Sequence, residues 1–114
     1  MLRYVVLHHD GIEPPHFDLM FETAPLSPLS TWRSPAWPIE KSARLTRLGD
    51  HRRDYLTYQG PLTNVRGSVR RVAEGTCELE IRSELIWHLT FLTPAPPRRL
   101  RLLALTADLW LASD

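Results

Sequence analysis

Apolar and polar residues alternate in short stretches along most of the chain, a pattern typical of strands that bury one face. The clearest stretch is residues 16–22, where three large apolar side chains fall on one face and His16 and Asp18 fall on the other. Segments rich in proline or glycine separate such stretches at spacings of roughly 8–12 residues, which favour a sandwich or a barrel. The pattern therefore predicts an all-β domain.

The predicted strands are residues 3–8, 16–22, 30–34, 43–48, 54–59, 68–72, 76–82, 85–93, 98–106 and 108–112. The expected connections are residues 23–29, 35–38, 49–51, 60–61, 64–67, 73–75 and 94–97. Because closure removes exposed strand edges in so short a chain, we expect a small closed or nearly closed β-barrel of about eight to ten short strands, with little helix. Residues 100–111 could instead form a short amphipathic helix.

The composition fits one ordinary globular domain that spans residues 1–114. No apolar run reaches the roughly 20 residues that a membrane-spanning helix needs, and the beginning of the sequence lacks the pattern of a signal peptide. A single cysteine, Cys77, cannot form an internal disulfide and is expected to be a small buried hydrophobe. These features fit a cytoplasmic location and no membrane contact.

The net charge of +1 conceals an uneven distribution of charge along the chain. Residues 41–73 hold eight basic residues and two acidic ones, and thirteen of the fourteen basic residues in the chain are arginine. Arginine's planar fork suits phosphate recognition, so the clustering favours an anionic partner. A genome rich in G and C would also enrich arginine, and composition alone does not separate the two explanations.

The strongest chemical pattern joins His9 to His16 and Asp18. A turn-forming segment, residues 11–15, would bring His9 back toward the polar face of the following strand. Two imidazoles and one carboxylate suit zinc, manganese or iron and leave coordination positions open. Judged by spacing alone, a His-x-Asp pair is more often a solvated surface pair, so both interpretations stay open.

Two further segments carry candidate chemistry. Residues 49–55 place His51 and Tyr55 beside arginines, where they could hold an anionic group or simply form a solvated turn. Trp32 and Trp37 are expected to pack in the core or at its rim, although exposed aromatic rings can also stack on bases.

Taken in order, these motifs resemble the 3′-phosphoesterase domain of bacterial DNA ligase D and its stand-alone relatives. Residues 4–10 (YVVLHHD) match the opening strand that ends in His-Asp, and residues 16–22 (HFDLMFE) match His-x-Asp-x-Arg-x-Glu except at Met20. The third motif, Trp-x-x-Pro-x-x-Pro, is matched by Trp32, Pro35 and Pro38. The fourth, Asp-His-x-x-x-Tyr, is matched by Asp50, His51 and Tyr55. The resemblance covers about residues 3–75.

The resemblance implies a small β-barrel that binds manganese, or another divalent metal, and removes a 3′-phosphate or a terminal ribonucleotide from nucleic-acid ends. Carried over by position, His9, His16 and Asp18 would hold the metal, and His51 and Tyr55 would contact the phosphate or the metal site. The implied partners are nucleic-acid 3′ ends and a DNA ligase or polymerase.

The sequence departs from the family pattern where a phosphate clamp is expected. Met20 stands in place of the arginine, and the lysine between the two prolines of the third motif is absent. Arg33 is our first candidate for the missing catalytic cation, and Arg44 and Arg52 are further candidates for binding phosphate. The alternatives are a non-catalytic module of the same fold that binds nucleic-acid ends or metal, and a non-haem iron oxygenase, which normally needs a larger jelly roll.

Overall fold

The computed structural model describes residues 1–62 and 67–113, and within them every regular element except one short 3-10 helix is a β-strand. The elements are β1 (Leu2–Asp10), β2 (His16–Glu22), β3 (Leu29–Ser34), β4 (Arg44–His51), η1 (Arg53–Leu56), β5 (Gly60–Pro61), β6 (Ser68–Arg82), β7 (Ile86–Phe91), β8 (Arg98–Ala104) and β9 (Leu109–Ser113). None of the described residues belongs to a helix long and apolar enough to cross a bilayer.

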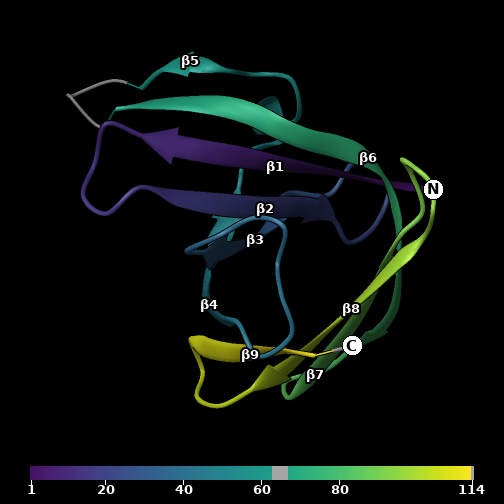
Figure 1. The fold of residues 1–114 in the computed structure, drawn as a ribbon. Coiled ribbons are helices and arrows are strands. Elements are labelled where there is room, and N and C mark those ends of the chain that lie inside the picture. The colour runs from purple at the N-terminus through teal and green to yellow at the C-terminus, as the bar shows by residue number, and fades with distance from the viewer. Residues whose placement is uncertain (63–66, 114) are drawn as a thin grey trace.

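Strand pairing closes the sheet into a barrel. The strands follow the order β1-β2-β3-β4-β9-β8-β7-β6, each antiparallel to its neighbours, and β6 pairs back onto β1. The two-residue strand β5 lies outside this ring, against the start of β6. In Figure 1, β6 curves from its place beside β1 to its place beside β7 and so joins the two walls. The predicted all-β barrel is confirmed.

The long strand β6 corrects one sequence-based prediction. Residues 68–72 and 76–82 were expected to form two strands joined by a connection at 73–75, but they form one strand of 15 residues. Gly75 is required there for a close approach rather than for a turn, because a Cβ on it would lie 2.0 Å from the carbonyl oxygen of Thr93.

Three predictions around η1, and the alternative helix near the end of the sequence, were also wrong. Residues 49–51 continue β4 instead of turning, residues 53–56 form the 3-10 helix η1 and so replace the first half of the predicted strand 54–59, and residues 60–61 pair as β5. The alternative helix at residues 100–111 is absent, since these residues form β8, a turn and β9. The turn predicted at residues 64–67 lies mostly outside the described residues.

The barrel interior is filled by apolar side chains around three tryptophans. Trp32, Trp87 and Trp110 are each at most 1% exposed, and their rings meet edge to face with centroids 4.9–5.3 Å apart. Trp37 is partly buried and packs against this core, as expected. Cys77 is fully buried, and burial raises the pKa of its thiol to about 12, which leaves it a small hydrophobe rather than a nucleophile.

A second apolar cluster covers part of the outer face of the barrel. It contains Val5, Leu7, Met20, Leu29, Leu56 and Val69, with Tyr55 and Leu62 packed against it. Because η1 contributes Leu56 and Tyr55, this helix acts as a lid over the outward faces of β1 and β2. Both faces of these two strands are therefore partly buried.

Gly75 and Gly49 offer a matched test of the close approach between β6 and Thr93. Gly75→Ala should destabilise the protein by about 3 kcal/mol, the upper range for overpacking, because the new methyl group meets the Thr93 carbonyl. Gly49→Ala meets nothing within 4 Å and should be neutral or stabilising by up to about 1 kcal/mol. Urea denaturation measures both, and equal effects would contradict the assigned crowding.

Candidate metal centre

Three polar side chains converge on the outer face of the barrel where β1 ends and β2 begins. The β1–β2 register pairs His9 with His16 and Leu7 with Asp18, so all three polar residues share one face. One ligand atom from each of His9, His16 and Asp18 lies within 4.8 Å of the others. His8 faces the other way and stacks on Phe17, with ring centroids 4.6 Å apart.

The distances within this group suit a divalent cation. His9 Nδ1 lies 3.1 Å from His16 Nε2, and His16 Nε2 lies 3.8 Å from Asp18 Oδ2. A first-row cation bonded at about 2.1 Å to two ligands at roughly 90–110° would hold those ligand atoms about 3.0–3.4 Å apart. The three side chains therefore need to move by less than an ångström or so to enclose a metal, and such a set leaves positions open for water or substrate.

His16 is oriented for this role by the turn that precedes it. The carbonyl oxygen of Pro14 lies 3.3 Å from His16 Nδ1, so a proton assigned to Nδ1 leaves the lone pair of Nε2 directed at the group. Burial lowers the pKa of His16, Asp18 opposes this effect, and Arg33 and His9 reinforce it. The imidazole is therefore held in the neutral, metal-binding form near neutral pH.

Arg33 on the neighbouring strand completes the group. Arg33 pairs with Asp18 in the β2–β3 register, and its Nε and Nη2 donate to Asp18 Oδ1 and Oδ2 at 3.0 and 3.4 Å. This two-point contact balances the charge of Asp18, whose carboxylate is almost fully buried. Two of the five guanidinium N–H donors are used, which leaves three for another acceptor.

The structure does not bring His51 and Tyr55 into this group. Their rings contact each other with centroids 5.6 Å apart, and Tyr55 packs on the outer apolar cluster. His51 pairs with Leu29, which is opposite Glu22, so it lies four residues along the sheet from Asp18, or about 13 Å at the usual strand rise. The buried Met20 and its apolar neighbours separate the two places.

The two further candidates for binding phosphate, Arg44 and Arg52, lie at the start of β4 and directly after its end. Arg44 is exposed on the outer face, two residues from Thr46, which pairs with Arg33. Arg52 is exposed directly before η1, beside His51. Arg44 is thus on the side of His9, His16 and Asp18, whereas Arg52 is on the side of His51.

Sequence reasoning missed an ion pair that ties η1 to the barrel. Arg53 Nη1 donates to Glu22 Oε2 at 2.6 Å and to the Ser27 carbonyl at 2.9 Å, while the Arg3 N–H donates to Glu22 Oε1 at 2.7 Å. Burial tends to raise the pKa of Glu22, but the hydrogen bonds from Arg53 and Arg3 outweigh burial and lower the pKa. The signal in the sequence was that Glu22 shares a strand face with His16 and Asp18, which indicates that it could be buried and paired.

Comparison with known proteins assigns no family to this chain. No family model matches it, and a search of curated proteins finds no significant match. A function for the group on β1, β2 and β3 therefore has to be argued from its own residues and geometry.

The Arg53–Glu22 pair gives a stability test with a neighbouring control. Arg53→Ala should cost about 3–5 kcal/mol in the free energy of unfolding, because it leaves the buried Glu22 carboxylate without its counter-ion. Arg52→Ala, at the exposed neighbouring position, should change this energy by less than about 0.5 kcal/mol.

Acid should remove the difference between Arg53→Ala and the wild type. The folded-state pKa of Glu22 lies below its unfolded value, so its stabilising contribution is present above the unfolded pKa and disappears as pH falls through the folded pKa. Urea denaturation across this pH range provides the measurement. A difference that persists undiminished in acid would show that Arg53 acts through packing instead.

Proposed function

We propose that the chain is a divalent-metal-dependent phosphoesterase that acts on the 3′ ends of nucleic acids. The observation that carries the proposal is the convergence of His9, His16 and Asp18 within 4.8 Å, beside the guanidinium of Arg33. The motif resemblance over residues 3–75 supports the same activity. Removal of a blocking 3′ group would prepare an end for a DNA ligase or polymerase in cytoplasmic DNA repair.

The donor set fits the metal that this activity requires. His9 through Nδ1, His16 through Nε2 and Asp18 through Oδ2 would hold a cation such as Mn²⁺, with open positions left on it. When bound, the cation would polarise a phosphoryl oxygen and lower the pKa of a bound water. Pro14 contributes by holding the His16 ring in its orientation.

Arg33 takes the place of the arginine that Met20 replaces. Met20 is 2% exposed within the outer apolar cluster and carries no charge, so it cannot bind a phosphate. Arg33 keeps spare N–H donors while it holds Asp18, and these can stabilise the negative charge that develops on the phosphoryl group. Arg44, exposed on the same face, would contact the backbone of the nucleic acid.

In this arrangement His51, Tyr55 and Arg52 would bind the strand away from the reacting phosphate. The Tyr55 ring contacts those of His51 and Tyr58, with centroids 5.6 and 6.4 Å away. Partly exposed aromatic rings beside an arginine suit bases and the phosphate backbone of a single strand. Their distance along the sheet from Asp18 corresponds to a few nucleotides.

A non-catalytic end-binding module remains the second candidate. The observation in its favour is that Arg33 is occupied by both oxygens of Asp18. Met20 also stands where the family pattern has an arginine, so no second cation is available there. Turnover of a 3′-phosphorylated oligonucleotide with Mn²⁺ separates the two candidates. Phosphate release that EDTA abolishes supports the enzyme, whereas binding of the oligonucleotide without release supports the module.

Metal binding tests the group of three ligands directly. In calorimetric titration with Mn²⁺, His16→Ala and Asp18→Asn should lose measurable affinity, because each removes one of three donors. His88→Ala, a histidine on β7 outside the group, should bind as the wild type does. Affinity of the wild type should fall with decreasing pH, because an imidazole must be neutral to bind. Wild-type affinity in either ligand variant would remove that residue from the set.

Removal of Arg33 should separate binding from turnover. Arg33→Ala is expected to lower kcat on the order of 10²-fold, the scale for loss of one charge-stabilising donor. Its Mn²⁺ affinity should be unchanged or higher, because a cation no longer competes with the guanidinium for Asp18. Thr46→Ala, at the exposed position paired with Arg33, is the control and should keep wild-type turnover. A parallel loss of metal affinity in Arg33→Ala would mean that Arg33 is needed for the shape of the site.

A further inference from the structure

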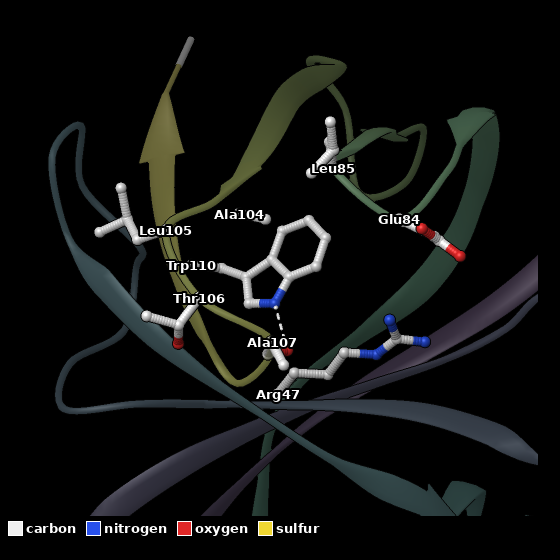
Figure 2. A pocket seen from close by; sticks show the side chains of 8 residues that line it. All are labelled: Arg47, Glu84, Leu85, Ala104, Leu105, Thr106, Ala107 and Trp110. Atoms are coloured by element: carbon white, nitrogen blue, oxygen red, sulfur yellow. Dashed lines mark hydrogen bonds between the residues drawn. The ribbon is translucent and has the colours of Figure 1, made fainter.

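A cavity opens into the barrel interior at the turns that join β6 to β7 and β8 to β9. It has a volume of about 400 Å³, within the range of small-molecule sites. Its lining includes Arg47, Glu84, Leu85, Leu105, Thr106 and Trp110. Figure 2 shows the Arg47 side chain and the Trp110 ring side by side inside this mouth, with Glu84 and Leu85 on the turn across from them.

Arg47 is the unusual residue of this cavity. It follows Thr46 on β4, and while Thr46 pairs with the outward-facing Arg33, Arg47 pairs with Trp32 and faces inward. Its guanidinium carbon lies 4.9 Å from the ring centroid of Trp87, 5.4 Å from that of Trp32 and 6.0 Å from that of Trp110. Three indoles therefore hold one cation in place.

The Arg47 guanidinium has no anionic partner in the described part of the chain. No hydrogen bond or ion pair of its side chain is formed there, and Glu84 makes no ion pair with it. A second cation adds to the local charge, because Arg82 pairs with Trp87 and its guanidinium carbon lies 5.2 Å from the same indole. Two guanidinium groups thus share one ring, and neither forms an ion pair among the described residues.

A spare donor lies in the same cluster. Trp87 is 1% exposed, and its indole N–H has no hydrogen-bond partner among the described residues. The hydroxyl oxygen of Thr106 accepts from the N–H groups of Asp108 and Leu109, which leaves the hydroxyl proton to donate. Trp87 does not line the cavity, so the donors that the cavity presents are the Arg47 guanidinium and the Thr106 hydroxyl, and neither donates to an acceptor among the described residues.

We propose that this cavity binds a small organic anion, namely a carboxylate or a phosphate monoester attached to a compact apolar body. Arg47 binds the oxyanion, and the side chains of Leu85, Leu105 and Trp110 enclose the apolar part. The site lies on the inner side of the wall whose outer side carries Arg33 and Asp18. It is independent of the proposed metal-dependent activity, because it shares no residue with that centre.

Tryptophan fluorescence can test the proposal, because three of the four tryptophans lie within about 6 Å of the Arg47 guanidinium. The full chain is titrated in EDTA with phenyl phosphate, benzoate and inorganic phosphate. Saturable quenching by phenyl phosphate or benzoate is expected, and the stronger of the two identifies the preferred oxyanion. Weaker binding of inorganic phosphate is expected, because it lacks the apolar body.

Arg47→Gln should weaken binding of the better ligand at least tenfold, whereas Arg99→Gln, an exposed arginine on β8, should leave binding unchanged. If Arg47→Gln does not fold, Ala104→Leu provides the second test, since it narrows the cavity and keeps the cation. Near-UV circular dichroism checks that each variant is folded.

Absence of saturable quenching in the wild type would overturn the proposal. Equal affinity in folded Arg47→Gln, or in Ala104→Leu where that variant is the test, would also overturn it. Because EDTA removes any metal, failure here leaves the metal-dependent activity untouched, and loss of that activity leaves this result standing.

Discussion

The register between β1 and β2 is the constraint on which the other features of the molecule depend. It sets Tyr4 opposite Phe21 inside the barrel and His9 opposite His16 outside it. A slip of one residue would exchange the two faces, with the imidazoles moved into the core and the aromatic rings into solvent. Because large apolar side chains are buried on the inner face, the core itself enforces the register that assembles the candidate metal centre.

Burial on both faces explains the composition of these two strands. Val5, Val6 and Leu7 are all fully buried, although neighbouring residues of a strand point in opposite directions. The inner side chains join the tryptophan core, and the outer ones join the cluster beneath η1. The ion pair between Arg53 and Glu22 holds η1 against the barrel. The apolar cluster beside the candidate site therefore depends on a charged contact at the end of β2.

Local patterns predicted well the elements whose contacts are local. Residues 16–22 form a strand with the expected boundaries, because alternation with large apolar residues leaves one way to bury them. Residues 54–59 were predicted as a strand because they carry Tyr55 and Tyr58. The spacing of three between these tyrosines also fits a 3-10 turn, and so short a segment does not distinguish the two. Gly75 misled because its role lies in the approach of Thr93, a contact 18 residues away along the chain that no local pattern contains.

The candidate site divides in the same way. The spacing of His9, His16 and Asp18 was sufficient to expect their convergence, since one turn joins the two strands that carry them. Arg33 was expected to supply a cation for phosphate, and its contact with Asp18 was not predicted; the contact arises because Arg33 lies opposite Asp18 in the pairing of β2 with β3. The position of His51 required the irregular pairing of β3 with β4, and the tryptophan environment of Arg47 required closure of the whole barrel, which no stretch of sequence encodes alone.

The salt bridge between Arg33 and Asp18 bears on whether the protein needs a bound metal in order to fold. A buried carboxylate with no cation nearby would favour protonation or unfolding, as in small domains that fold only when their ion arrives. Here the guanidinium serves as a resident counter-charge. If the group binds a cation as proposed, the cation would replace the guanidinium as the positive partner of Asp18 in a barrel that is already folded, so folding would not depend on the metal.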